Sequence, residues 1–186
     1  MRPSRQDLLA AGNRRLRDII GPGLDVLFCG INPGLYSAAV GHHFARPGNR
    51  FWVALYAGGF TDRVLAPEEG RHLLESRCGL TDIVARATAR AEELGSDELI
   101  AGRERLERKV RKYRPQWVAI LGIGAYRTAF SQPRAILGPQ AQDLGGSQTW
   151  VLPNPSGLNA AHQPKDLARA FGQLREAVRS HAPPAD

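Results

Sequence analysis

Residues 25–34 read DVLFCGINPG, an apolar run that leads directly into an Asn-Pro turn flanked by glycines. The run over 25–31 is short and bounded by turn residues, which is typical of a strand buried on both faces of a parallel sheet. Comparable segments lie at 79–84, 116–121 and 148–152. The first of these is predicted as a strand or an extended turn, and the other two as buried strands.

Helical patterns separate these strands. Amphipathic spacing predicts helices over residues 7–20, 49–57, 67–77, 96–113, 122–130 and 163–181. Parallel strands joined by helices give a sheet that is covered on both faces. The sequence therefore predicts the α/β class: a single three-layer α/β/α domain over residues 1–186 with a mostly parallel central sheet. A short N-terminal helix should precede Asp25, and a frayed tail should follow Ala182.

The composition restricts the class of function. The 186 residues are 42% hydrophobic and 23% charged, which is typical of a soluble globular protein. No run is apolar enough to span a membrane and no signal peptide is evident, so we expect a cytoplasmic protein. Cys29 and Cys78 are too few for a zinc ribbon, and no metal is expected. The net charge of +7 favours an anionic partner, although basic surfaces also serve solubility.

Two related motifs follow predicted strands. GINPG occupies 30–34 and LPNPSGL occupies 152–158. Ligand sites of open parallel sheets form beyond the carboxyl ends of the strands. Proline fixes the turn, glycine allows close approach of a ligand, and asparagine supplies a donor and an acceptor. Either motif alone could be merely a tight turn. Together, with an aromatic and basic loop behind the first, they predict a binding site.

These motifs resemble those of one enzyme family. GINPG with the downstream run FARPGNRFW at 44–52 resembles the first motif of mismatch-specific uracil-DNA glycosylases, the relatives of thymine-DNA glycosylase. NPSGL at 154–158 resembles their DNA-intercalating loop, and LTDIV at 80–84 with Arg86 and Thr88 resembles the middle of the family. The likeness runs from about Val26 to Leu174.

The resemblance implies a uracil-DNA glycosylase-like fold and a monofunctional DNA repair glycosylase. Such an enzyme flips uracil out of double-stranded DNA, preferentially from G·U mismatches, and hydrolyses the N-glycosidic bond with water. It leaves an abasic site and needs neither a metal nor an organic cofactor. We expect it to act as a monomer, because it must wrap around a single lesion.

The resemblance also implies roles for single residues. Asn32 would hold the attacking water. The base-binding pocket would be formed by Ile31, Gly34, Phe44 and Asn154, with Phe44 stacking on the flipped base. A loop anchor packed on the sheet is the alternative for Phe44. The contacts to DNA would come from Ser156, Gly157, Leu158, Asn159, Arg46 and Arg50. Leu158 would be the apolar wedge, and the two arginines are candidates for phosphate contacts.

Asp82 departs from the family pattern, which has an uncharged or basic residue at this place. Asn32 is neutral and therefore a poor general base. A carboxylate in the segment expected to end near the same pocket would supply the base catalysis that Asn32 lacks, so we predict that Asp82 is catalytic. The alternatives are that Asp82 caps a turn or pairs with Arg86.

Other features leave alternatives open. Ala160 stands where a close bacterial relative carries a basic residue, which predicts weaker dependence on the opposing base and activity on single-stranded DNA. His42 and His43 favour contact with phosphate or solvent. Two rival functions remain: a non-catalytic module that binds mismatches or abasic sites, and an enzyme acting on a small nucleotide.

Overall fold

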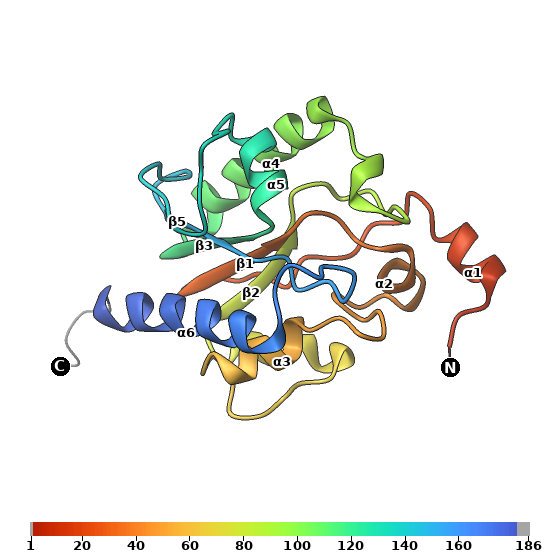
Figure 1. Cartoon of the computed structure of the whole chain (residues 1–186), viewed down its shortest axis with the longest axis horizontal. Coiled ribbons are helices and arrows are strands. Elements are labelled where there is room, and N and C mark those ends of the chain that lie inside the picture. Colours follow the sequence, from red (N-terminus) through yellow and green to blue (C-terminus); the bar gives the residue numbers. More distant parts are fainter. Residues whose placement is uncertain (1, 182–186) are drawn as a thin grey trace.

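The computed structural model describes residues 2–181 of the chain and contains a five-stranded sheet in the order β2-β1-β3-β5-β4 (Figure 1). The four longer strands pair in parallel: β1 Val26–Gly30, β2 Cys78–Asp82, β3 Trp117–Leu121 and β5 Gln148–Leu152. The fifth, β4 Gly138–Pro139, pairs antiparallel with β5. The predicted mostly parallel sheet is confirmed. Strand β4 was not predicted, because two residues are too few to form a pattern.

Helices cover both faces of this sheet. The α-helices are α1 Arg5–Ala10, α2 Leu35–Val40, α3 Phe51–Ala57, α4 Ser96–Tyr113, α5 Ile123–Ala129 and α6 Pro164–His181, and the 3₁₀ helices are η1 Pro67–Leu74 and η2 Ala91–Glu93. Helices α4 and α5 pack together on one face, and α3 and α6 pack together on the other (Figure 1). The predicted three-layer α/β/α arrangement is confirmed.

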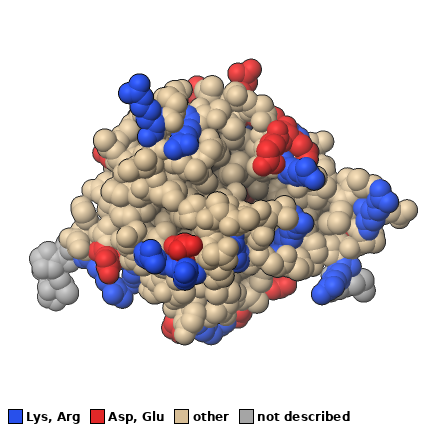
Figure 2. Space-filling view, in the orientation of Figure 1, with Lys and Arg blue, Asp and Glu red and all other residues tan. Residues whose placement is uncertain are grey.

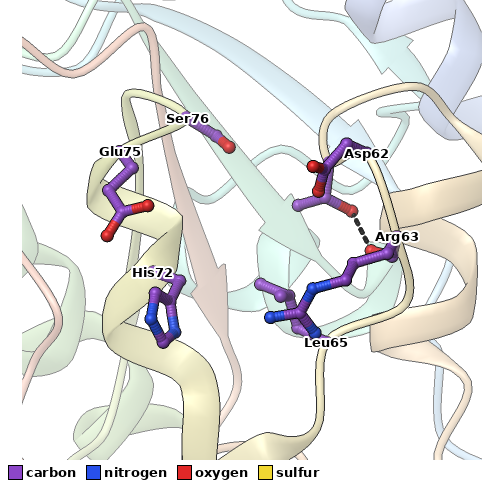
Figure 3. Close-up of a pocket in the computed structure, with 7 residues that line it drawn as sticks. Asp62, Arg63, Leu65, His72, Glu75 and Ser76 are labelled. Carbon is purple, nitrogen blue, oxygen red and sulfur yellow. Dashed lines mark hydrogen bonds between the residues drawn. The ribbon is translucent and has the colours of Figure 1, made fainter.

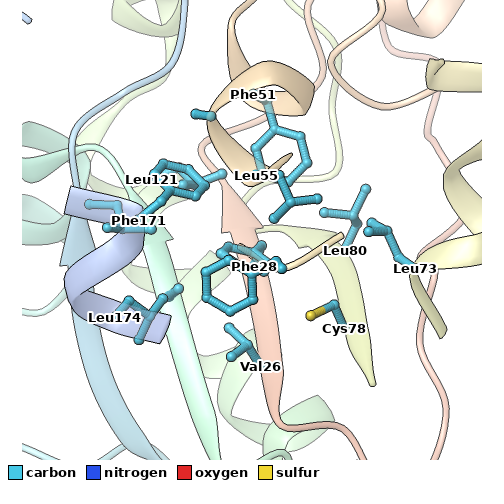
Figure 4. Close-up of a cluster of buried hydrophobic side chains, with 14 of the residues drawn as sticks. Val26, Phe28, Phe51, Leu55, Leu73, Cys78, Leu80, Leu121, Phe171 and Leu174 are labelled. Carbon is cyan, nitrogen blue, oxygen red and sulfur yellow. The ribbon is translucent and has the colours of Figure 1, made fainter. Parts of the chain in front are cut away.

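Strand β1 is buried on both faces and contributes to two separate cores. Val26 and Phe28 belong to the cluster under α3 and α6, whereas Leu27 and Cys29 belong to the cluster under α4 and α5. Phe28 lies among Phe51, Phe171 and other apolar side chains of those helices (Figure 4). Burying one such side chain contributes about 1.5–3 kcal/mol to folding. The central strands therefore form a rigid support for the loops at their carboxyl ends.

The predicted helix over 7–20 is wrong beyond Ala10. Asn13 adopts a left-handed conformation with a φ of 68°, which ends the helical path. Ile19 then pairs with Leu80 of β2 through two backbone hydrogen bonds of 2.9 and 2.7 Å. The apolar residues at the end of this segment, Ile19 and Ile20, pack against the two different cores and do not form one face of a helix. Backbone pairing with the sheet has overridden the local pattern.

The loop expected after β1 contains a further element, the short helix α2, which the glycine- and histidine-rich sequence did not suggest. The predicted frayed tail after Ala182 lies outside the described residues. Within residues 2–181, none of the helices has both the length and the apolar character needed to cross a membrane.

Candidate functional site

A cleft of about 960 Å³ opens at the carboxyl ends of the parallel strands. Its walls come mainly from the segments that follow β1, β2, β3 and β5, together with Asp82 at the end of β2. The lining includes most of the residues singled out in the sequence: Ile31, Asn32, Gly34, Phe44, Arg46, Asp82, Asn154, Ser156, Leu158 and Asn159. The two Asn-Pro motifs, more than a hundred residues apart in the chain, therefore meet in one cavity.

The Asn32 side chain is held in a single orientation. Its amide nitrogen donates hydrogen bonds to the Arg86 carbonyl oxygen at 2.8 Å and to Thr88 Oγ1 at 2.7 Å. Thr88 is buried and donates in turn to the Arg90 carbonyl oxygen. Both amide hydrogens of Asn32 are thereby used, and its Oδ1 is left as the acceptor that can hold a water molecule. Thr88 therefore orients Asn32, whereas the sequence placed it in a motif without assigning it a role.

The backbone around Asn32 is equally constrained. The Leu35 amide donates to the Thr88 carbonyl oxygen and the Thr88 amide donates to the Pro33 carbonyl oxygen, each at 3.1 Å. The Ile83 amide binds the carbonyl oxygen of Gly30 at 2.9 Å and so extends the β1–β2 pairing past the strand ends. The first motif is thus a continuation of the sheet and not a free loop.

Asp82 lies at the end of β2, and its side chain is only 8% exposed. Its Oδ2 is 3.4 Å from His43 Nδ1, and its Oδ1 approaches Gly30 so closely that any side chain there would collide with it. Burial raises the pKa of Asp82 to about 6, although the nearby His43 acts in the opposite direction. Arg86 pairs with Glu98 at 2.9 Å, so the alternative in which Asp82 pairs with Arg86 is wrong.

Phe44 is anchored on the core and also reaches the cleft, whereas its stacking on a flipped base stays a prediction. Its ring stacks on the core residue Phe51, with centroids 4.2 Å apart, and also lines the cleft. The backbone of Phe44 is left-handed with a φ of 53°, an uncommon conformation for a bulky residue. His43, beside it, is 5% exposed, so the expected solvent contact is wrong for this histidine.

The second motif forms a loop stabilised by its own polar groups. Asn154 Oδ1 accepts a hydrogen bond from the Ser156 amide at 2.9 Å, and Asn159 Nδ2 donates to the Asn154 carbonyl oxygen at 2.9 Å. Gly157 packs against the Gly48 carbonyl oxygen with no room for a side chain. Leu158 lines the cleft and is 69% exposed, so its side chain is accessible, and its insertion into DNA stays a prediction.

Arg50 connects the two motifs. Its guanidinium donates to the carbonyl oxygens of Ser156, Asn159 and His162 at 2.6–2.9 Å and to that of Pro155 at 3.4 Å. These bonds assign Arg50 a positioning role that the sequence did not indicate. Its contact with a DNA phosphate stays a prediction. The same holds for Arg46, which is exposed at the cleft.

The surface charge is less informative than the cleft. Lys and Arg side chains are spread over the face in Figure 2 and do not gather in a single patch. A second pocket of about 370 Å³ lies beside η1, among Asp62, Arg63, Leu65, His72 and Glu75 (Figure 3). None of the predicted site residues lines it.

Comparisons with known proteins agree with this geometry. A model of the Uracil DNA glycosylase superfamily matches residues 18–175, which include both motifs and the cleft. The solution structure of a protein from Methanosarcina acetivorans, provisionally described as a uracil DNA glycosylase, is similar to this chain with a TM-score of 0.57 and 18% identity. The match covers 88% of this chain and 98% of that protein, and it shows a shared fold. The chain belongs to the uracil DNA glycosylase superfamily.

Proposed function

We propose that this DNA glycosylase acts on uracil opposite guanine and belongs to the mismatch-specific branch related to thymine-DNA glycosylase. One observation carries the proposal: an oriented amide, Asn32, and a buried carboxyl group, Asp82, line the same cleft, with the exposed Leu158 at its side. Superfamily membership implies base excision from DNA. The motif residues support the finer assignment.

The chemistry starts with extrusion of the base. A base inside a duplex cannot present C1′ to water, so the nucleotide must be flipped, at a cost of a few kcal/mol that is lowest at a mismatch. Leu158 would fill the gap, because an apolar wedge offsets lost stacking. Phe44, already supported by Phe51, would stack on the flipped base.

Hydrolysis then needs an oriented water and a proton acceptor. Asn32 Oδ1 would hold the water against C1′, and Asp82 would take one of its protons as the C1′–O bond forms. The C1′–N1 bond breaks with its electron pair on the base, which leaves as an anion and is protonated afterwards. Because Asn32 would orient the water and Asp82 would take its proton, the proposed reaction uses no metal or organic cofactor. With no lysine in either motif, no Schiff-base step is proposed.

The second part of the proposal concerns how strongly excision depends on duplex DNA and on the opposing base. Ala160 contributes only a methyl group to the wedge loop, so fewer contacts reach the opposite strand than a basic residue would make. We therefore propose that preference for G·U over A·U follows mainly from the easier opening of the mismatch, and that single-stranded uracil is also a substrate.

The test is single-turnover excision from labelled G·U, A·U and single-stranded uracil oligonucleotides, read after alkaline cleavage. Asn32→Ala and Asp82→Asn should each slow excision by about 10²–10⁴-fold, the usual contribution of a positioned proton-transfer or orienting group. Asp143→Asn is the matched control, because it removes the same charge from an exposed residue away from the cleft and should leave the rate unchanged. Tight DNA binding by a wild-type protein without excision would instead favour the binding-module function.

A further inference from the structure

His43 and Asp82 form a buried pair beside the reaction centre. His43 Nδ1 lies 3.4 Å from Asp82 Oδ2, and the two side chains are 5% and 8% exposed. We propose that His43 is a positioning residue that, oriented by the Arg17 carbonyl, shares a proton with Asp82 and so controls when this carboxylate can accept a proton. The catalytic consequence rests on the proposed function, whereas the pairing itself does not.

The orientation of the His43 ring follows from its other nitrogen. His43 Nε2 lies 3.0 Å from the carbonyl oxygen of Arg17. A carbonyl oxygen can only accept, so Nε2 must carry the hydrogen. The His43 carbonyl oxygen also accepts a hydrogen bond from Trp52 Nε1 at 3.3 Å, which holds the residue in place. A neutral ring therefore turns the bare Nδ1 towards Asp82.

This tautomer decides which proton states are favourable. With a neutral ring and an ionised carboxyl group, two acceptors face each other across 3.4 Å. One proton between Nδ1 and Oδ2 removes that conflict, either as an imidazolium beside a carboxylate or as a carboxylic acid donating to Nδ1.

Other charged groups near Asp82 largely offset one another. On the opposite side of β2, Asp18 and Lys109 form an ion pair of 2.6 Å, and both bind Thr81 Oγ1. The Cys29 thiol is also close, but burial raises its pKa well above the ordinary value, which keeps it neutral. His43 is therefore the one ionisable group among residues 2–181 that the structure records in contact with the Asp82 carboxyl group.

The pair has a direct consequence for the reaction. When the attacking water gives its proton to Asp82, the new acid hydrogen donates to His43 Nδ1, and the conflict of two acceptors becomes a hydrogen bond. A positively charged His43 ring instead lowers the pKa of Asp82, which favours the ionised carboxylate and keeps it available. His43 thus extends downwards the pH range in which Asp82 can act as a base, without touching the substrate.

Two substitutions separate the contacts of His43. His43→Gln retains an amide at the place of Nε2 and loses the group facing Asp82. His43→Asn retains an amide near the place of Nδ1 and loses the bond to Arg17. Neither side chain can ionise. His42→Gln, which changes the neighbouring histidine, is the matched control.

The primary experiment is carboxyl ¹³C NMR of aspartate-labelled protein over pH, with Asp82 assigned through Asp82→Asn. The Asp82 titration should move to higher pH in His43→Gln, move less in His43→Asn, and stay unchanged in His42→Gln. Coincident titrations in all four proteins would overturn the proposal. Imidazole ¹⁵N NMR of the wild type alone gives a second test: the neutral His43 ring should be protonated at Nε2, and protonation at Nδ1 would contradict the pairing.

The pH dependence of single-turnover excision links the pair to catalysis. The acid limb of the rate profile should move to higher pH in His43→Gln, and in an Asp82→Asn background the same substitution should have no effect on the limb. An unmoved limb would overturn the catalytic part. If the wild-type protein excises no uracil, the proposed function is wrong. The NMR titrations would still decide whether His43 and Asp82 form a pair.

Discussion

The two sides of the cleft are built differently. The side that carries Asn32 and Asp82 continues the β1–β2 pairing, and its backbone and side-chain hydrogen bonds connect it to the segment that follows β2. The side that carries Leu158 is a loop whose carbonyl groups converge on one guanidinium, that of Arg50. The residues proposed for the chemistry thus lie on a preorganised wall, and the residue proposed for insertion lies on a loop with one principal attachment.

This difference has a physical reason. A water molecule and its acceptor must be held within a fraction of an ångström, which a sheet edge provides better than a loop. A wedge must approach a deformed duplex, and exposed loops suit that task. Substitutions on the two sides should therefore be distinguishable by which measurement they change.

The largest difference between the two sides of the cleft is expected when the buried Asp82 carboxyl group is replaced. Burial raises the pKa of Asp82 from 3.8 to about 6, so the folded protein holds this proton more tightly than the unfolded chain does. The contribution of this proton to the free energy of unfolding is fully present below pH 3.8 and is lost as the pH rises through about 6. Asp82→Asn should consequently raise the free energy of unfolding at pH 8 by up to about 3 kcal/mol.

Denaturant unfolding at pH 8 and at the lowest pH where the protein remains folded measures this effect. The gain should shrink at the acid end, and Asp143→Asn should show no comparable change. An equal gain at both pH values would point to packing in place of charge as its cause.

On the loop side of the cleft, the largest loss of activity is expected from replacing Arg50. Arg50→Ala removes hydrogen bonds from a charged donor, each worth about 1.5–3 kcal/mol, and should slow excision from duplex DNA by about 10- to 100-fold. Single-stranded uracil needs no wedge, so its excision should fall much less. Arg46→Ala is the control: it should leave the loop intact and lower the salt dependence of binding by about one phosphate contact. Equal losses on both substrates would show that Arg50 acts beyond the loop.

The smallest effect is expected at Thr88. Thr88→Val retains the shape of the side chain but leaves one Asn32 amide hydrogen without its partner. A lost hydrogen bond of about 1 kcal/mol corresponds to a roughly fivefold lower single-turnover rate on every substrate. Thr61→Val, beside the second pocket, should leave the rate unchanged. A loss confined to duplex DNA would indicate that Thr88 affects the loop side instead.

The sequence predicted the supporting frame better than its periphery. The strands are almost entirely buried, and the long helices α4 and α6 bury one residue at every third or fourth position, so both show strong patterns. The helix predicted over 7–20 is wrong at its end because Ile19 and Ile20 pack against two different cores from an extended backbone. A pattern of apolar residues cannot show that the backbone will pair with Leu80, more than fifty residues away.

The site shows the same division. Asn32, Phe44 and Asn154 could be found from motifs because each follows a strand or lies in a distinctive local sequence. For His43 the sequence predicts contact with phosphate or solvent, and for Arg50 it predicts a phosphate contact, which the structure leaves untested. Their actual partners, Asp82 and the carbonyl groups after Pro155, come from distant segments that only the fold brings together.

The two edges of the sheet affect how soluble the protein stays at high concentration. One edge terminates in the two-residue β4, whose Pro139 has no amide hydrogen to offer, and the other is covered at Leu80 by Ile19. Exposed strand edges are the usual templates for aggregation, and short strands, proline and covering segments are the usual protection. These irregular segments, which the sequence pattern did not predict, thus shield the edges of the sheet from pairing with other chains, while the carboxyl ends of its strands face the open cleft.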